Sequence, residues 1–287
     1  MISEADAAVE PDPSRRQAYA HDGDDVGVLV CHGFTGSPQG VRPLAEAFAR
    51  AGHTVRLPLL PGHGTTWQEC NGTTWRQWYA EVEAAFVELR ARCRVVVCAG
   101  LSMGGALALR LAQLHPDDVA GLVLVNPAVR VDDPRMLALP VLHHVLPSLP
   151  GIGNDIKAVG GEPEWCYDRI PLRALASQTR LWRLTVAHLE EVTMPVLLAH
   201  STQDHVVPAS SWRLVRDRIG SVDVTELELA NSYHVATLDN DAELLERDAV
   251  AFVARVAAGS SGAAGSPGAA GSSGASGSSG ASERRPS

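Results

Sequence analysis

Residues 98–109 read CAGLSMGGALAL, and this stretch carries the sharpest local signal in the sequence. It contains the pattern G-x-S-x-G, with Ser102 between Gly100 and Gly104. An apolar, strand-like run precedes it and a helical pattern follows it, which is the strand–turn–helix context that a nucleophile elbow requires. The small neighbours of Ser102 permit the strained turn, and the start of the next helix favours developing negative charge. Glycine-rich turns of this kind also occur without catalysis, so the hypothesis that Ser102 is a nucleophile needs a base elsewhere in the chain.

On both sides of this turn, short apolar runs alternate with helical patterns along the chain. Near-continuous Val and Leu runs of this length are typical of parallel strands that are covered on both faces. The alternation predicts an α/β fold of three layers. The predicted strands are 26–33, 53–60, 94–100, 121–128, 194–200 and 222–230, and the predicted helices between them are 43–52, 74–93, 103–115, 210–220 and 241–257.

Composition places the domain boundaries. Residues 1–17 form an acidic leader that we expect to be mobile, and residues 18–257 form the α/β domain. The interval after the fourth strand is too long for one crossover helix, and it predicts a cap inserted at about 130–178. Residues 258–287 are almost entirely Gly, Ser and Ala, so they offer too little apolar surface to offset the entropy of ordering. We expect this tail to be disordered.

Charge and hydropathy exclude several classes of protein. The 287 residues hold 24 Lys plus Arg and 33 Asp plus Glu, and the net charge of −9 argues against a nucleic-acid binder. No stretch approaches the ~18 apolar residues of a membrane span, so we expect no stable insertion into membranes.

The first ten residues are acidic and do not resemble a signal peptide, which predicts a cytoplasmic protein. The five cysteines include no CxxC pair, so a zinc site or a disulfide framework is not expected, and Cys31 and Cys98 are predicted to be buried thiols.

A base and an acid for Ser102 follow two later strands. Asp204 comes after the run at 194–200, and His234 comes after the run at 222–230. The carboxyl ends of parallel strands converge at one edge of a sheet, so both residues are expected to meet Ser102 there. His205 is a weaker candidate for the base because it does not lie on the final loop, and Asp239 is interpreted as a residue that caps the last helix.

A second glycine-rich turn, CHGFTGSPQG at residues 31–40, follows the first strand. It places the backbone N–H of Phe34 where an oxyanion would form, and the N–H of Met103 is the expected partner donor. The turn is not a phosphate-binding loop, because it matches neither G-x-x-x-x-G-K-[ST] nor G-x-G-x-x-G.

Five segments in this order, HGFTGSP, LPGHG, GLSMGG, QDHVVP and NSYHVATLD, resemble serine α/β-hydrolases of the bacterial carboxylesterase and monoacylglycerol lipase family. The resemblance covers about residues 18–257. It implies a carboxylic-ester hydrolase that acts on monoacylglycerols or on short- to medium-chain esters, with no metal or organic cofactor. It also implies that Ser102, Asp204 and His234 form the catalytic triad, and that Phe34 and Met103 donate to the oxyanion.

Substrate-binding residues are sought in the cap. Four apolar residues of the stretch 136–149 are predicted to line an acyl pocket, although a cap helix also buries one face simply by packing. They are Leu137, Leu142, Val145 and Leu146. Glu164, or its neighbour Glu162, is a candidate to contact a glycerol hydroxyl group, and a solvated loop is the alternative.

Two other functions remain open at this point. The first is an acyl thioesterase of the same fold, which the chain disfavours because Lys157 is its only lysine and no basic cluster for the phosphates of coenzyme A is evident. The second is a ligand receptor without catalysis, because fold alone does not dictate function. The expected partner of the esterase is a small-molecule acyl ester, which is its substrate.

Overall fold

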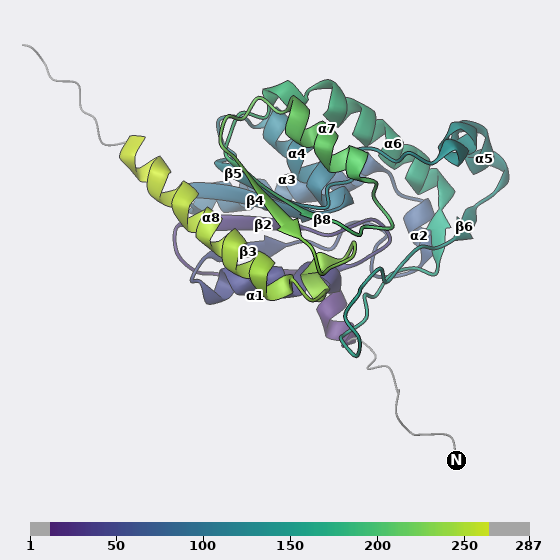
Figure 1. Cartoon of the computed structure of the whole chain (residues 1–287), viewed down its shortest axis with the longest axis horizontal. Coiled ribbons are helices and arrows are strands. Elements are labelled where there is room, and N and C mark those ends of the chain that lie inside the picture. Colours follow the sequence, from purple (N-terminus) through teal and green to yellow (C-terminus); the bar gives the residue numbers. More distant parts are fainter. Residues whose placement is uncertain (1–11, 264–287) are drawn as a thin grey trace, which may run out of the picture.

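A computed structural model of the chain describes residues 12–263, and Figure 1 shows a central sheet between two layers of helices. The sheet has seven strands in the order β1-β3-β2-β4-β5-β8-β9, and every strand is parallel to its neighbour except β1. This confirms the predicted α/β fold. The strands are β1 Tyr19–His21, β2 Val26–Cys31, β3 Thr54–Leu57, β4 Val95–Leu101, β5 Gly121–Val125, β8 Val196–Ser201 and β9 Val224–Leu229.

The central strands form because their side chains are apolar on both faces. Every residue of β2, β4, β5 and β8 is buried, as expected for strands covered by helices on each side. The edge strand β9 is mostly exposed or half-buried instead, and only Leu229 at its end is buried. The six predicted strands are therefore all present, and β1 is an additional antiparallel edge strand that lacks an apolar run.

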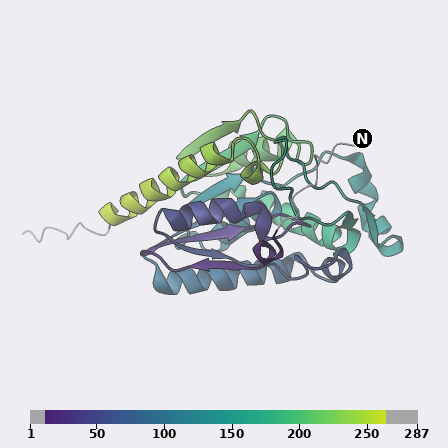
Figure 2. The same cartoon turned by 90° about the horizontal axis from the view of Figure 1, so that it is seen from below.

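Helices cover the two faces of the sheet unequally. Phe48 of α1 and Phe252 of α8 belong to one apolar core. Phe86 of α3, Leu107 of α4 and Leu181 of α6 belong to the other core. Figure 2 shows the same layers from below. The helices of the body are α1 Arg42–Arg50, α2 Trp67–Asn71, α3 Trp75–Arg92, α4 Met103–Leu114, α6 Leu172–Ala187, α7 Ala209–Arg218 and α8 Ala242–Ala263.

The cap is inserted between β5 and α6 and extends to one side of the body in Figure 1. It contains a 3-10 turn at Pro134–Ala138, the helix α5 at Leu139–Val145, and a small antiparallel hairpin of β6 at Ser148–Pro150 and β7 at Arg169–Pro171. The helix α6 begins at Leu172 and packs against α4, so the structure returns to the body earlier than the predicted cap boundary at 178.

The described ends of the chain differ from the predicted boundaries. Residues Pro13–Arg16 form a 3-10 turn in which Arg15 pairs with Glu162 of the cap at 3.1 Å. The last helix continues to Ala263, past the boundary at 258, because adding residues to an existing helix costs little once a nucleus has formed. Residues 1–11 and 264–287, which complete the predicted leader and tail, lie outside the described residues. Within residues 12–263, no helix has both the length and the apolar character needed to cross a membrane.

Candidate active site

Ser102 lies in a strained turn between β4 and α4. Its backbone has φ 57° and ψ −117°, a conformation that costs a non-glycine residue about 1–3 kcal/mol. Surrounding hydrogen bonds hold the turn, because Ser102 N–H donates to the carbonyl of Val125 at 2.9 Å and its own carbonyl accepts from Ala128 N–H at 3.0 Å. The sequence prediction of a sharp strand-to-helix turn at this serine is confirmed.

The glycines on both sides of Ser102 are required by close backbone approach. A Cβ on Gly100 would lie 2.3 Å from the carbonyl carbon of Gly104, and a Cβ on Gly104 would lie 2.1 Å from the carbonyl oxygen of Cys31. Both distances are far below van der Waals contact. The turn therefore packs directly against the end of β2, and this contact fixes the position of Ser102.

We expect Gly104→Ala to disturb the elbow. The added methyl group must displace either the turn or the end of β2, and overpacking of this kind costs about 1–3 kcal/mol. The expected result is a Tm lower by several degrees and a kcat/KM for ester hydrolysis lower by about 10²-fold, because the nucleophile moves. Gly161→Ala is the matched control, since its nearest neighbour would be 3.8 Å away. Wild-type Tm and rate in Gly104→Ala would contradict this account.

Asp204 and His234 form a short, shielded pair. Asp204 Oδ2 lies 2.7 Å from His234 Nδ1, and the two side chains are only 8% and 9% exposed. The other carboxylate oxygen of Asp204 accepts the N–H groups of Val206 at 2.8 Å and Val207 at 2.7 Å. An aspartate held in this way fixes the proton of the ring on Nδ1 and leaves Nε2 as a base.

The sheet brings these groups to one edge. Ser102, Asp204 and His234 follow β4, β8 and β9, and β5 fills the place between β4 and β8. All four strands are parallel, so their carboxyl ends lie together. Among the described residues, no hydrogen bond joins Ser102 Oγ to His234, and such catalytic bonds commonly tighten only when substrate is present.

Asn126, which sequence reasoning missed, ties the loops behind this edge together. Its side-chain amide donates to the carbonyl of His234 at 2.8 Å and to Ser201 Oγ at 3.0 Å, and its oxygen accepts from Ser201 N–H at 2.8 Å. Asn126 has a φ of 44°, a region that asparagine tolerates better than most residues. The sequence signal that points to Asn126 is its place immediately after a buried strand. A polar side chain that is buried there needs hydrogen-bond partners, and this suggests a structural role.

Opposing effects set the pKa of His234. Burial alone would lower the pKa of the imidazole, but the carboxylate of Asp204 bonds to the ring, and Glu164 and Asp155 add further negative charge nearby. The pKa of His234 is consequently raised above its ordinary value of 6.5.

We expect this raised pKa to set the acid limb of activity. His234 accepts a proton only when it is neutral, so kcat/KM should fall as the pH drops through a value above 6.5. A group whose pKa is raised by folding also stabilises the fold at low pH, and that contribution disappears as the pH rises through the folded pKa. A profile of kcat/KM between pH 4 and 9 checks this expectation. An acid limb below 6.5 would contradict it.

The loop after β2 carries the predicted oxyanion donor Phe34. Within residues 12–263, the N–H groups of Phe34 and Met103 donate to no protein acceptor, so both are available to a ligand oxygen. The loop lies beside Ser102, because a Cβ on Gly33 would be 3.6 Å from Cβ of Ser102.

His32 fastens that loop. Its Nδ1 lies 2.9 Å from the carbonyl of Gly33, and its Nε2 accepts the N–H of Leu60 at 3.2 Å, which assigns the proton to Nδ1. Burial, together with the neighbouring His63, lowers the pKa of His32 to about 3. The ring therefore stays neutral near pH 7, and its hydrogen bonds to Gly33 and Leu60 hold the loop in place.

Glu164 lies beside the same loop. Its Oε1 occupies the space next to Gly36, where a Cβ would approach it to 3.0 Å. Its backbone N–H donates to Asn154 Oδ1 at 2.9 Å, and burial raises the pKa of its carboxyl group. The alternative candidate Glu162 bonds to Arg15 instead.

The predicted acyl-pocket residues are not brought together. A groove of about 840 Å³ lies between the cap, α6 and α7. Its lining is mixed: apolar residues that include Val129, Met136, Leu139 and Leu214 stand beside Arg130, Arg180, Arg183, His143 and His144. Leu137 lines this groove, whereas Leu142, Val145 and Leu146 do not. Val145 is 70% exposed and Leu146 is 42% exposed.

None of Ser102, Phe34 and His234 lines the groove either, although its wall begins at Val129. The preceding residue Ala128 hydrogen-bonds to the carbonyl of Ser102. The groove therefore begins close to Ser102 in space, next to the residue that bonds to its carbonyl, but it is not the space directly above Ser102.

Comparisons with known proteins identify the family of the chain. The Hydrolase_4 family model, described as "Serine aminopeptidase, S33", matches residues 24–241. A thermostable monoacylglycerol lipase from Bacillus sp. (strain H-257) is 42% identical over 240 residues, which cover 83% of this chain and 94% of that protein. A carboxylesterase from Bacillus subtilis (strain 168) is 23% identical over 83% of this chain and 96% of its own length.

Among solved structures, one from a study of LipS and LipT, two metagenome-derived lipolytic enzymes, has a TM-score of 0.81 and 43% identity. It covers 84% of this chain and 98% of that chain. The match of the family model over most of the chain, the identity to full-length relatives and the strained serine turn lead to one assignment. The chain belongs to the Hydrolase_4 family and is a hydrolase of the bacterial α/β-hydrolase type.

Proposed function

We propose that this enzyme is a serine carboxylic-ester hydrolase whose triad is Ser102, His234 and Asp204. The observation that carries the proposal is the shielded 2.7 Å contact between Asp204 and His234 at the sheet edge where the Ser102 elbow is also found. An aspartate–histidine pair of this kind activates a serine hydroxyl for acyl transfer. The 42% identical relative from Bacillus, a monoacylglycerol lipase, supports esters as the substrate class.

In the first half of the reaction, Ser102 Oγ attacks the ester carbonyl while His234 Nε2 removes its proton. The carbonyl oxygen becomes an oxyanion, which accepts the free N–H groups of Phe34 and Met103. His234 then gives the proton to the departing alcohol, and the acyl group remains on Ser102. Asp204 stabilises the imidazolium throughout, in keeping with its short bond to Nδ1.

In the second half, water replaces the alcohol. His234 removes a proton from the water, whose oxygen attacks the acyl carbonyl, and the oxyanion again forms against Phe34 and Met103. The collapse of this intermediate breaks the bond to Ser102 Oγ, which recovers its proton from His234. The products are a carboxylic acid and the free enzyme.

We further propose that the substrates are monoacylglycerols or short- to medium-chain esters. Glu164 is the group proposed to bind a glycerol hydroxyl, because its carboxyl lies beside the loop of Phe34 and close enough to His234 to affect its charge. For the acyl chain, the apolar residues along the groove that begins at Val129 offer a better-supported path than the exposed residues Val145 and Leu146.

A substrate panel tests the proposal. Initial rates are measured on monoacylglycerols of increasing chain length, p-nitrophenyl esters, acyl-CoA thioesters and an aminoacyl p-nitroanilide. The proposal expects esters to exceed the thioesters and the anilide by at least tenfold in kcat/KM. Faster turnover of acyl-CoA would favour the thioesterase, faster turnover of the anilide would favour a peptidase, and no turnover of any compound would favour a receptor without catalysis.

A further inference from the structure

Asp155, in the cap segment between β6 and β7, contacts both loops that carry the proposed acid and base. Its Oδ2 accepts the backbone N–H of His234 at 3.1 Å and that of His205 at 3.1 Å. Its Oδ1 lies 2.8 Å from His205 Nδ1, and its own carbonyl accepts the N–H of Val235 at 3.1 Å. The side chain is only 13% exposed, so these contacts are partly shielded from water.

The same stretch of the cap is fastened to the histidine loop a second time. Asp239 accepts the N–H groups of Lys157 at 2.7 Å and Ala158 at 2.8 Å with its carboxylate, and it also accepts Tyr233 N–H at 2.8 Å. Asp155 and Asp239 thus hold residues 155–158 against residues 233–235 from two directions. The contacts are hydrogen bonds to backbone groups, which fix the course of the chain rather than the rotamer of one side chain.

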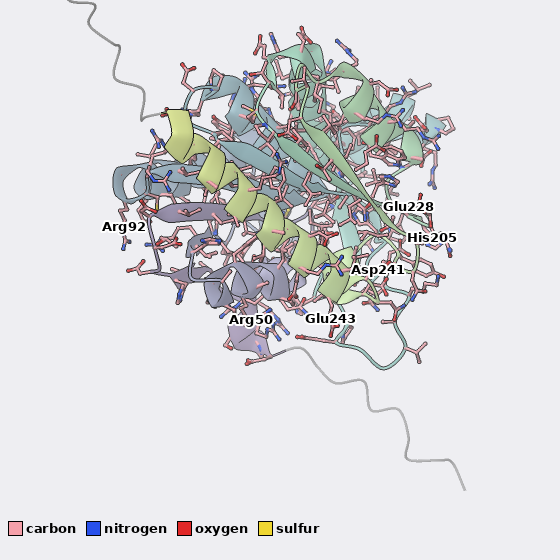
Figure 3. The ribbon with its side chains drawn as sticks, turned by 60° about the vertical axis from the view of Figure 1, so that its left-hand side comes forward. Arg50, Arg92, His205, Glu228, Asp241 and Glu243 are labelled. Carbon is pink, nitrogen blue, oxygen red and sulfur yellow. The ribbon has the colours of Figure 1, made fainter. Side chains whose placement is uncertain are left out.

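His205 provides the link to the acid. It directly follows Asp204 in the chain, and its ring stands edge-on to Tyr233 with 4.5 Å between the ring centres. Figure 3 shows His205 at the opposite end of the molecule from Arg92, which marks the end of α3. Because Asp155 bonds to both His205 and His234, its carboxylate bridges the loop after β8 and the loop after β9.

We propose that Asp155 is a positioning residue for His234, which places the base by binding its backbone N–H and supplies a negative charge close to its ring. This inference rests on the proposed function, because it assigns His234 as the base. Three carboxylates raise the pKa of His234 by their negative charge: Asp204 from the loop after β8, and Glu164 and Asp155 from the cap. Asp155 differs from the other two because it alone also bonds to the main chain of His234.

Two substitutions separate the two effects. Asp155→Asn keeps an oxygen that accepts the backbone N–H groups but removes the charge, so the protonated form of His234 loses a favourable interaction. We expect the pKa of His234, and with it the acid limb of kcat/KM, to move to lower pH while kcat at its plateau changes by less than about fivefold. Asp155→Ala also removes the acceptor, and we expect it to lower plateau kcat by about 10- to 100-fold with KM within about threefold.

Asp168→Asn is the matched control, because Asp168 is an exposed carboxylate of the same cap whose side chain has no hydrogen bond within the described residues. It should leave kcat, KM and the acid limb unchanged. The pKa of His234 is also measured directly by NMR titration of the imidazole, which does not depend on turnover. Melting curves for each variant show whether it is folded at the assay temperature.

An unchanged His234 titration in Asp155→Asn, or wild-type kcat in folded Asp155→Ala, overturns the proposal. A loss in Asp155→Ala that disappears below its melting range also overturns it, because the role is then structural stability alone. Failure of the proposed function would look different: wild-type enzyme would not hydrolyse esters, while the NMR titration would still report whether Asp155 acts on His234.

Discussion

Replacing Ser102 by alanine is expected to lower kcat for ester hydrolysis by about 10⁶-fold, the cost of removing the nucleophile from a triad that works as a unit. The fold should survive the change. Alanine has the same positive-φ strain as serine at this position, and Ser102 Oγ makes no hydrogen bond within the described residues, so none is lost. Rates on a p-nitrophenyl ester together with the Tm of both proteins provide the measurement.

The control for this experiment is Ser210→Ala, which removes a hydroxyl of α7 that bonds to Asp132 and should leave the rate unchanged. A fluorophosphonate probe adds a second readout, because it should label wild-type enzyme at Ser102 and fail to label Ser102→Ala. A folded Ser102→Ala enzyme with a near-normal rate would remove the basis of the proposed mechanism, and a label on another residue would reassign the nucleophile.

The sequence predicts most of the fold because the central strands carry their own signal. The runs that form β2, β4, β5 and β8 are buried on both faces, and continuous apolar residues are what such burial requires. The strand β1 has no comparable signal. It is three residues long, lies at the edge of the sheet and has an exposed central alanine, so its pairing with β3 depends on the neighbouring strand and not on its own composition.

The candidate site is only partly readable from sequence. Ser102, Asp204 and His234 can be located because each follows a recognisable strand, and topology brings the ends of those strands together. Asn126 and Asp155 act on backbone groups of His234 that are 108 and 79 residues away in sequence. The position of Asn126 directly after a buried strand is a local hint, but the sequence around Asp155 gives none. The partners of both residues depend on how close the cap and the loops lie in the folded protein.

The cap shows a related difficulty. An amphipathic pattern over residues 136–149 indicates that one helical face is apolar, but it does not say which residues face the body. In the structure Leu139 is buried, whereas Leu137 and Val141 are 86% and 71% exposed. The cap is small, so only part of its apolar surface packs against the body. Its other apolar residues lie along the groove or in solvent.

Replacing His234 by alanine should reduce kcat nearly as much as the loss of Ser102, by about 10⁶-fold, whereas His205→Ala should keep kcat within about tenfold of wild type. The two residues differ in their surroundings. His234 is shielded and bonded to Asp204 at 2.7 Å, and His205 is 58% exposed and turned toward Asp155. Without the ring of His205, Asp155 still accepts both backbone N–H groups, so the histidine loop keeps most of its support.

The comparison is made with both variants at the pH plateau, and their melting curves show that each is folded. Labelling by a fluorophosphonate gives an independent measure, since it also requires an activated serine: His234→Ala should react very slowly with the probe and His205→Ala should react at nearly the wild-type rate. The opposite order would assign the base to His205. That result would also require Asp204 to act on its sequence neighbour, which its bonds to Val206 and Val207 and its contact with His234 Nδ1 argue against.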